Sequence, residues 1–235
     1  MQVHRLDPIP FEPDIRDMLR RMNISGKSSP GGKIAERLLE GARVAVPKAV
    51  YGEALIGKRG TDYIVADGIC FTSRVLRVNT GNTDRLYPFL VTCGTELENW
   101  SQTMDAPLEK YVAALIEEEA CRAAMHRLFK TIDIDHCLRY PSAMNPGSVE
   151  DWPISQQRNL FQLLKGAHAD IGIELLESLL MKPARSMSGV RFSGIHPYTN
   201  CQICPRGECA GRMEPYDSER AQFYRCAPPN RGETL

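Results

Sequence analysis

The chain has 235 residues, enough for one large domain or two small ones with a substantial hydrophobic core. Its 29 Lys and Arg balance 29 Asp and Glu, so bulk electrostatics gives no reason to expect nucleic acid or an anionic membrane as a partner. No apolar run approaches the roughly 18 residues that a membrane span needs, and the N-terminus lacks the apolar core of a signal peptide. We therefore expect a cytoplasmic protein.

The first 95 residues predict two helices followed by short strands. Apolar residues at helical spacing predict helices over 15–22 and 33–42, with a Gly- and Ser-rich loop over 25–32 between them. Strand patterns follow at 43–51, 63–66, 69–78 and 86–94. The Asp67-Gly68 pair predicts a hairpin turn between the second and third of these strands.

The longest helix is predicted over 106–131, with Pro107 in its first turn. At 100° per residue, Glu119 falls in the middle of the apolar stripe of this helix, whereas Glu117 and Glu118 are predicted to be solvated. A carboxylate on an apolar face needs a partner or a ligand. Two interpretations of Glu119 stay open: it binds a ligand, or it lies at the edge of the buried face and pairs with an arginine.

Residues 139–153 form an irregular segment with three prolines and a glycine, and loops of this length in a compact domain tend to be functional. Ser155 is predicted to cap a helix over 156–167. Strands are predicted at 171–180 and 188–193, with a turn over 181–186. Helices and strands do not alternate regularly, which favours an α+β fold with a largely antiparallel sheet flanked by helices.

The eight cysteines fall into two groups. Four occur singly among apolar neighbours and are expected to be small buried hydrophobic residues: Cys70, Cys93, Cys121 and Cys137. Four crowd the last 35 residues and predict a metal site in a reducing compartment: Cys201, Cys204, Cys209 and Cys226. The spacing allows an iron–sulfur cluster, a structural zinc ion, or free or disulfide-bonded cysteines. Arg206 and Arg212 are expected to offset thiolate charge.

Residues 172–189 read Gly-Ile-Glu-Leu-Leu-Glu-Ser-Leu-Leu-Met-Lys-Pro-Ala-Arg-Ser-Met-Ser-Gly. This stretch resembles the activation domain of cobalamin-dependent methionine synthase, which carries a similar Glu-Ser-x-x-Met-x-Pro-x-x-Ser-Val-Ser-Gly pattern. The helix 114–126 resembles that family's long helix. The Asn-Pro-Gly-Ser loop 145–148, with Asp-Trp-Pro at 151–153, resembles its ligand loop. The resemblance implies an activation-domain-like unit over 1–195, poorly matched in 1–85. The cysteine pattern predicts a Cys-rich metal-binding tail over 196–235.

The family's domain binds S-adenosylmethionine and presents it to cob(II)alamin, which is reduced by one electron and remethylated. The resemblance implies that the following residues bind this ligand: Glu119, Arg139, Pro146, Gly147, Ser148, Ser186, Ser188 and Gly189. The family loop reads Arg, three residues, Gly, Tyr. This chain has Ala143 in the arginine position and Ser148 in the tyrosine position, and its nearest arginine is Arg139.

The resemblance also implies a partner. The chain lacks the Asp-x-His-x-x-Gly stretch with which corrinoid-binding modules supply an axial histidine, so the cobalamin is expected on a separate corrinoid-dependent methyltransferase or its corrinoid-binding domain. The chain has no flavin or nicotinamide fingerprint, and reactivation needs a one-electron reductant. This favours an iron–sulfur cluster over zinc. The alternatives are a non-catalytic corrinoid- or partner-binding module with structural zinc, and a small-molecule binding protein that has lost the chemistry.

Overall fold

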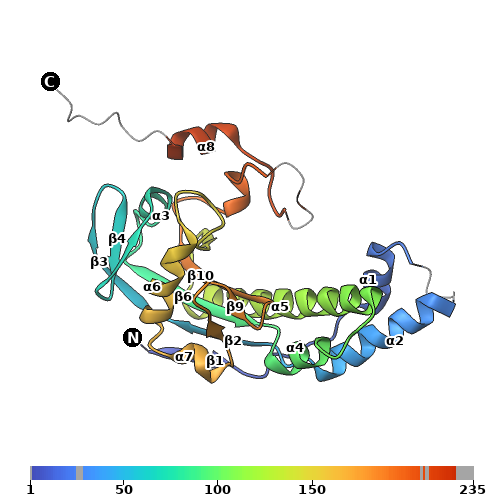
Figure 1. The fold of residues 1–235 in the computed structure, drawn as a ribbon. Helices are drawn as coiled ribbons and strands as arrows, with labels where there is room; N and C mark the ends of the chain where they lie inside the picture. Colours follow the sequence, from blue (N-terminus) through green and yellow to red (C-terminus); the bar gives the residue numbers. More distant parts are fainter. Residues whose placement is uncertain (1, 25–28, 207–208, 210–211, 226–235) are drawn as a thin grey trace.

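The computed structural model describes residues 2–24, 29–206, 209 and 212–225. The chain forms a mixed α+β fold around an eight-stranded antiparallel sheet with helices on both faces (Figure 1). This confirms the predicted fold class. Among the helices of the described ranges, none is both long enough and apolar enough to cross a membrane.

The sheet is organised around β6, the strand with the most continuous burial. Its strands are β1 (Val3–Leu6), β2 (Lys48–Gly52), β3 (Ala54–Arg59), β4 (Tyr63–Ala66), β5 (Ile69–Thr72), β6 (Arg85–Thr92), β7 (Pro141–Met144) and β10 (Ser186–Ser193). β6 pairs with β2 and β3 along one side and with β10 along the other, and β7 pairs with the far side of β10. A separate hairpin joins β8 (Glu174–Leu175) to β9 (Met181–Lys182).

Helices cover both faces of the sheet. They are α1 (Ile15–Arg21), α2 (Ser29–Val44), α3 (Arg74–Asn79), α4 (Thr95–Ser101), α5 (Pro107–Asp135), α6 (Gln157–Leu163), α7 (Ala167–Asp170) and α8 (Ser218–Arg225), with short 3-10 turns η1 (Ile154–Gln156) and η2 (Asn200–Gln202). Helices α1, α2, α4 and α5 share a core with Phe89 and Val91 of β6, whereas α6 and α7 share one with Leu90. Because side chains alternate along a strand, these two helix groups lie on opposite faces.

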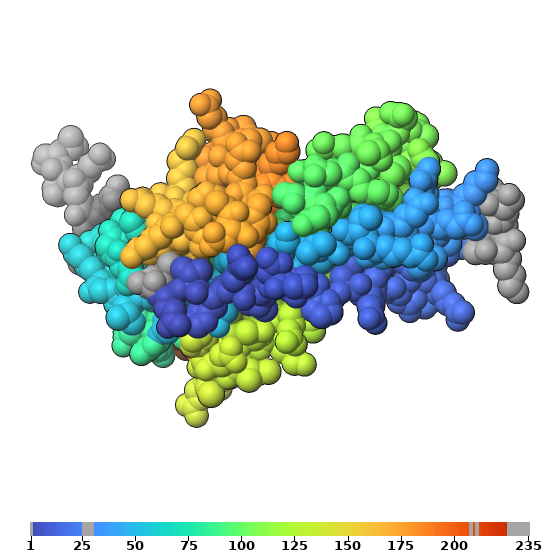
Figure 2. Space-filling model, turned by 90° about the horizontal axis from the view of Figure 1, so that it is seen from below, coloured from blue at the N-terminus to red at the C-terminus, as the bar shows by residue number. Residues whose placement is uncertain are grey.

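Figure 2 shows this layering from the side of the N-terminal segment (blue). Residues 165–185 (orange) lie on one side of that segment, and the end of α5 (yellow-green) lies on the other. The C-terminal tail belongs with the face that carries α6. Its buried residues Tyr198 and Tyr224 join the core that contains Phe71 and Leu76. Tyr224 Oη donates to Asn79 Oδ1 over 2.8 Å, which ties α8 to α3.

Two of the predicted elements in the first half are corrected by the structure. The second predicted helix is longer than expected and runs from Ser29 to Val44, so the following strand begins only at Lys48. The predicted strand 69–78 ends at Thr72. Ser73 Oγ accepts a hydrogen bond from Leu76 N over 3.0 Å and caps α3, and this local cap overrides the β-branched residues that follow.

The second half differs from prediction in three places. The predicted strand 171–180 contains only the two-residue strand β8. Ser155 is not a helix cap, because it lies inside η1 and the α6 N-cap is Gln156 without a side-chain cap bond. The irregular segment 139–153 contains β7, which Pro141 begins at the outer edge of the sheet.

Candidate functional site

The structure brings together two of the three stretches on which the family resemblance rests, the loop 145–148 and the serine-glycine stretch, but not the helix stretch 114–126 that carries Glu119. Strands β7 and β10 pair antiparallel, and β7 leads directly into the loop 145–148, called the Pro-Gly loop from here on. Asn145 Nδ2 donates to Ser188 O over 2.8 Å. The Pro-Gly loop therefore begins beside β10, next to Ser188 and Gly189. Its predicted ligand residues are Pro146, Gly147 and Ser148.

Gly147 gives the Pro-Gly loop its turn. Its φ is +80°, a conformation that L side chains rarely adopt, and its N–H donates to Trp152 O over 2.7 Å. Gly147 and Ser148 are exposed, whereas Pro146 is buried. The loop thus offers a backbone turn and one hydroxyl group to a ligand from solvent.

Gly189 is required by the close approach of β7. A Cβ atom at this position would lie 2.5 Å from Met144 O and 2.6 Å from Asn145 Nδ2. Of the two predicted serines, Ser188 is buried, and Ser186 Oγ lies 2.8 Å from Pro183 O and 3.0 Å from Thr92 Oγ1. The hydroxyl of Ser186 is thus engaged in holding the turn before β10.

The Asp-Trp-Pro stretch after the Pro-Gly loop anchors it to the body of the protein. The Asp151 carboxylate accepts hydrogen bonds from Ser73 Oγ, from Arg74 N over 3.2 Å and from Val75 N over 3.0 Å, so it completes the N-terminal cap of α3. Trp152 is fully buried. The sequence did not indicate this anchor, because Asp151 and Ser73 are 78 positions apart.

Gln156 is a second anchor that sequence reasoning missed. Its side-chain amide accepts from Thr72 N over 2.9 Å and donates to Thr72 O over 2.6 Å, as a neighbouring strand would. It also accepts from Trp152 Nε1 over 3.1 Å. The amide of Gln156 therefore extends the ladder of β5, and no sequence signal distinguishes it from any other polar residue of a helix start.

Arg139 lies before β7, at the opposite end of that strand from the Pro-Gly loop. Its backbone N–H donates to Ser193 Oγ over 2.8 Å, and its side chain is exposed. Within the described residues, no hydrogen bond or ion pair of its guanidinium is found. The structure does not bring Arg139 into contact with the loop, and its role in binding stays a prediction.

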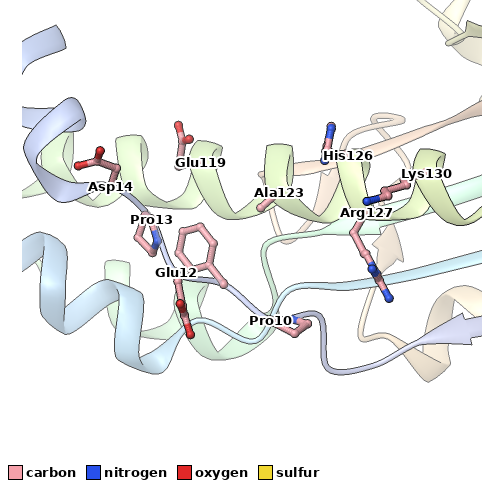
Figure 3. A pocket seen from close by; sticks show the side chains of 10 residues that line it. Pro10, Glu12, Pro13, Asp14, Glu119, Ala123, His126, Arg127 and Lys130 are labelled. Carbon is pink, nitrogen blue, oxygen red and sulfur yellow. The ribbon is translucent and has the colours of Figure 1, made fainter.

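Glu119 lies on the other face of the sheet from the Pro-Gly loop. Its Oε2 is 3.0 Å from Arg21 Nη2, and its side chain is 29% exposed, which agrees with the interpretation of an edge carboxylate paired with an arginine. It borders a hollow of about 390 Å³ between α5 and residues 10–14 (Figure 3). The residues that line this hollow include none from the Pro-Gly loop or β10.

Glu117, predicted to be solvated, is buried instead. Burial raises the pKa of its carboxyl group, and the nearby charge of Glu98 raises it further, whereas a hydrogen bond with Ser101 and the charge of Arg185 act in the opposite direction. The prediction failed because α5 packs against α2 and α4 as well as against the sheet. Its buried face is therefore wider than a single stripe.

The scattered cysteines follow the prediction in part. Cys93 and Cys121 are buried, and burial raises the pKa of both thiols, to about 12 for Cys121. Cys70 and Cys137 are exposed, contrary to expectation. Cys70 lies on the edge strand β5, and Cys137 follows the C-terminus of α5 with a φ of +49°.

The cysteine segment, residues 201–213, begins in the 3-10 turn η2. Cys201 and Cys204 are half-buried, Cys209 is exposed, and Cys226 lies outside the described residues. The three described thiols are free, and Met213 N donates to Cys201 Sγ over 3.4 Å. In the part of the chain that the structure describes, no three His, Cys, Asp or Glu side chains are arranged to hold a metal ion.

Arg212 organises the backbone of the cysteine segment. Its Nη1 donates to Cys201 O over 2.8 Å, and its Nη2 donates to Cys204 O over 3.3 Å and to Arg206 O. A guanidinium with five N–H donors suits this task. Arg212 was expected to offset thiolate charge. In the structure, its guanidinium donates hydrogen bonds to the carbonyl groups of the turns that carry the cysteines.

Comparison with known proteins identifies the fold. No family model matches the chain, and no curated protein matches its sequence. Among solved structures, the chain is similar to the crystal structure of the MetH reactivation domain bound to AdoHcy, with a TM-score of 0.57 and 18% sequence identity. The similarity covers 86% of this chain and 82% of that one. The protein therefore has the fold of the MetH reactivation domain.

Proposed function

We propose that this protein supports the reductive reactivation of a separate corrinoid-dependent methyltransferase. The observation that carries the proposal is the contact between the Pro-Gly loop and β10, where Asn145 Nδ2 donates to Ser188 O over 2.8 Å. These two stretches are far apart in sequence, and both resemble the ligand-binding parts of one family. The fold similarity to the MetH reactivation domain, which was solved with AdoHcy bound, supports the same assignment.

The ligand that we propose for this junction is S-adenosylmethionine, of which AdoHcy is the demethylated form. The proposed site comprises Pro146, Gly147, Ser148, Ser186, Ser188 and Gly189. The exposed hydroxyl group of Ser148 can donate or accept a hydrogen bond, and the exposed turn at Gly147 permits close approach of a ligand. We leave Glu119 and Arg139, which the resemblance also implies, out of this proposed site, because Glu119 pairs with Arg21 and Arg139 lies at the opposite end of β7 from the loop.

In the proposed reaction, a one-electron reductant reduces cob(II)alamin on the partner to cob(I)alamin. The cob(I)alamin then attacks the methyl group of S-adenosylmethionine, which leaves methylcobalamin and S-adenosylhomocysteine. The role of this chain is to hold the methyl donor at an exposed surface where the partner's cobalt can reach it. The exposure of Gly147 and Ser148 suits that role.

We also propose that the cysteine segment binds an iron–sulfur cluster through Cys201, Cys204, Cys209 and Cys226. The thiols of the three described ligands are free, and the N–H of Met213 points to the sulfur of Cys201, as amides beside cluster thiolates do. When bound, such a cluster supplies single electrons. The site depends on Cys226, which lies beyond the described residues.

A second candidate is a non-catalytic partner-binding module in which zinc shapes the tail. It is favoured by the way the cysteine segment is held by its own hydrogen bonds, from Arg212 to Cys201 O and from Asp217 N to Gln202 O over 2.8 Å. A structural zinc ion would hold the cysteine segment further, in addition to these hydrogen bonds. Analysis of iron, sulfide and zinc in anaerobically purified protein decides between the two, because zinc without iron removes the electron-transfer role.

The test of the proposed function is a reactivation assay. An oxidised corrinoid methyltransferase is mixed with a reductant and S-adenosylmethionine, and loss of the cob(II) spectrum is followed with and without this protein. We expect the protein to accelerate the loss and Gly147→Ala to abolish the acceleration, since its Cβ would lie 3.0 Å from Ile154 Cδ1 at a φ of +80°. Gly57→Ala, whose methyl group meets open space, is the control. A rate equal to that without protein would refute the proposal.

A further inference from the structure

The turn that precedes β10, residues 183–185, is held by a buried side chain of α4. The Glu98 side chain belongs to a residue that is only 8% exposed, and its Oε1 accepts the N–H of Ala184 over 2.8 Å. One residue further on, the carbonyl group of Arg185 accepts from Cys93 N over 3.1 Å. Two hydrogen bonds with buried residues therefore fix the backbone of the turn directly before Ser186 begins β10.

The position of this turn determines where Ser186, a member of the proposed ligand site, is placed. Ser186 Oγ lies 2.8 Å from Pro183 O inside the turn and 3.0 Å from Thr92 Oγ1 on β6. From Ser186 onward β10 pairs with β6, and this strand carries Ser188 and Gly189. A displacement of the turn therefore moves the hydroxyl group of Ser186 and the start of β10.

Glu98 belongs to a buried cluster of titratable side chains between α4, α5 and this turn. The exposed fractions of its members lie between 0% and 9%: Cys93, Glu98, Glu117 and Cys121. The charges of both glutamates act on Cys93, and the charge of Glu98 acts on Glu117, so the members lie within electrostatic reach of one another. The charged groups that face the cluster are Arg185 from the turn and, from α5, Glu118 and Arg122, which pair with each other over 2.7 Å.

The charge balance of the cluster favours one ionised carboxyl group over two. Two ionised groups would exceed the single positive charge of Arg185, and a buried carboxylate without a cation is costly. Burial raises the pKa of Glu117. Glu98 Oε1, in contrast, accepts the N–H of Ala184, and a carboxylate accepts such a bond more strongly than a neutral group does. The proton therefore belongs on Glu117 and the negative charge on Glu98.

We propose that Glu98 is a positioning residue for the proposed ligand site, because it holds Ala184 and the turn before β10, and that it does so only while Glu117 keeps its proton. The inference rests on the proposed function for the ligand, whereas the proton-dependent contact is a property of the buried cluster itself. Loss of the proton from Glu117 puts a second negative charge among buried groups. Ala184 and Arg185 are exposed, so water enters most easily at the turn, and the bond from Ala184 to Glu98 breaks.

The N–H of Ala184 reports on this contact directly. Its hydrogen exchange, divided by the intrinsic rate at each pH, is measured in the full-length protein from about pH 5 to about pH 9, the range in which strongly buried carboxyl groups titrate. In the wild type, we expect the protection to fall about tenfold as the pH rises, as for the loss of one hydrogen bond to a charged group. In Glu117→Gln, which cannot ionise, the protection should stay constant.

Variants of Glu98 test the positioning role. Glu98→Ala should leave Ala184 unprotected at every pH, whereas Glu98→Gln, which still offers a carbonyl oxygen, should restore the protection and remove its pH dependence. Glu118→Gln is the matched control. Glu118 is the next residue of α5, but its side chain is 51% exposed, so the wild-type pH dependence should remain. Calorimetric titration of S-adenosylhomocysteine should show weaker binding at high pH in the wild type, but not in Glu117→Gln.

The two readouts separate the possible failures. If S-adenosylhomocysteine binds to no variant at any pH, the proposed function fails, and the exchange data still decide whether Glu98 and Glu117 control the turn. Constant protection of Ala184 in the wild type, or a fall that persists in Glu117→Gln, overturns the inference. An affinity that does not follow the protection of Ala184 overturns the positioning role. If Glu98→Ala does not fold, Glu98→Gln decides, because a wild-type pH dependence in this variant contradicts the inference.

Discussion

The ion pair between Arg191 and Asp133 fastens the strand that carries the proposed ligand residues to the long helix. Arg191 Nε is 2.9 Å from Asp133 Oδ1, and Nη2 is 2.7 Å from Oδ2, so the pair is bidentate. The two side chains are only 12% and 25% exposed. The guanidinium also lies 4.3 Å from the ring centroid of Phe129. We predict that this pair contributes substantially to stability.

The magnitude follows from burial. Removing one partner of a fully buried ion pair costs about 3–5 kcal/mol, because the other charge is left unpaired. The partial exposure of Asp133 lowers this to roughly 2–3 kcal/mol, and loss of the contact with Phe129 adds about 0.5–1 kcal/mol. We therefore expect Arg191→Ala to cost about 3 kcal/mol. Arg191→Lys keeps the positive charge but cannot make the two parallel hydrogen bonds of the guanidinium, and it should cost about 1–2 kcal/mol.

Urea denaturation followed by circular dichroism measures these losses, provided that the slope of the transition stays unchanged. The matched control is Arg122→Ala. Arg122 pairs with Glu118 over 2.7 Å, but the side chains are 49% and 51% exposed, so its loss should cost only about 0.3–0.5 kcal/mol. Equal losses for Arg191→Ala and Arg122→Ala would refute the reasoning from burial.

Three further predictions concern buried or ligand-related residues. Because burial raises the pKa of Glu117, the folded chain keeps a proton that the unfolded chain has released, so stability falls as the pH rises through the folded pKa. Glu117→Gln should therefore raise Tm in mildly alkaline buffer but not below pH 4.5, the ordinary pKa of this group; an equal change at both pH values would contradict this. Gly189→Ala should lower the free energy of unfolding in urea by about 2 kcal/mol, because the added methyl group overpacks the contact with β7. The control Gly57→Ala should show no such loss. Glu119→Gln should leave the calorimetric affinity for S-adenosylhomocysteine unchanged and cost under about 1 kcal/mol of stability, because its ion pair with Arg21 is half-exposed. A tenfold weaker affinity would move the ligand to the hollow beside α5.

Local signals in the sequence predicted the parts of the fold that depend on periodicity and turns. The long helix, the hairpin at Asp67-Gly68 and the central strand after Arg85 are all present. The same logic failed where a side chain overrode the pattern. The cap at Ser73 converts a strand-like run into α3, and the packing of α5 on three neighbours buries Glu117.

Long-range contacts account for most of what the sequence did not predict about the site. Periodicity placed Glu119 on an apolar stripe but could not tell which face of the sheet that stripe would cover. Asp151 and Gln156 read as ordinary polar residues until the fold brings them to α3 and β5. The resemblance assigned the Pro-Gly loop and the serine-glycine stretch to one ligand site. The two segments do meet at Asn145 and Ser188, and their role in ligand binding stays a prediction.

The central claim is that a ligand of the S-adenosylmethionine class binds at the junction of the Pro-Gly loop and β10. The most direct measurement is a crystal structure of the anaerobically purified protein with S-adenosylhomocysteine. We predict ligand density in contact with Gly147, Ser148 and the flank of β10. Density in the hollow between α5 and residues 10–14, with the junction empty, would contradict it.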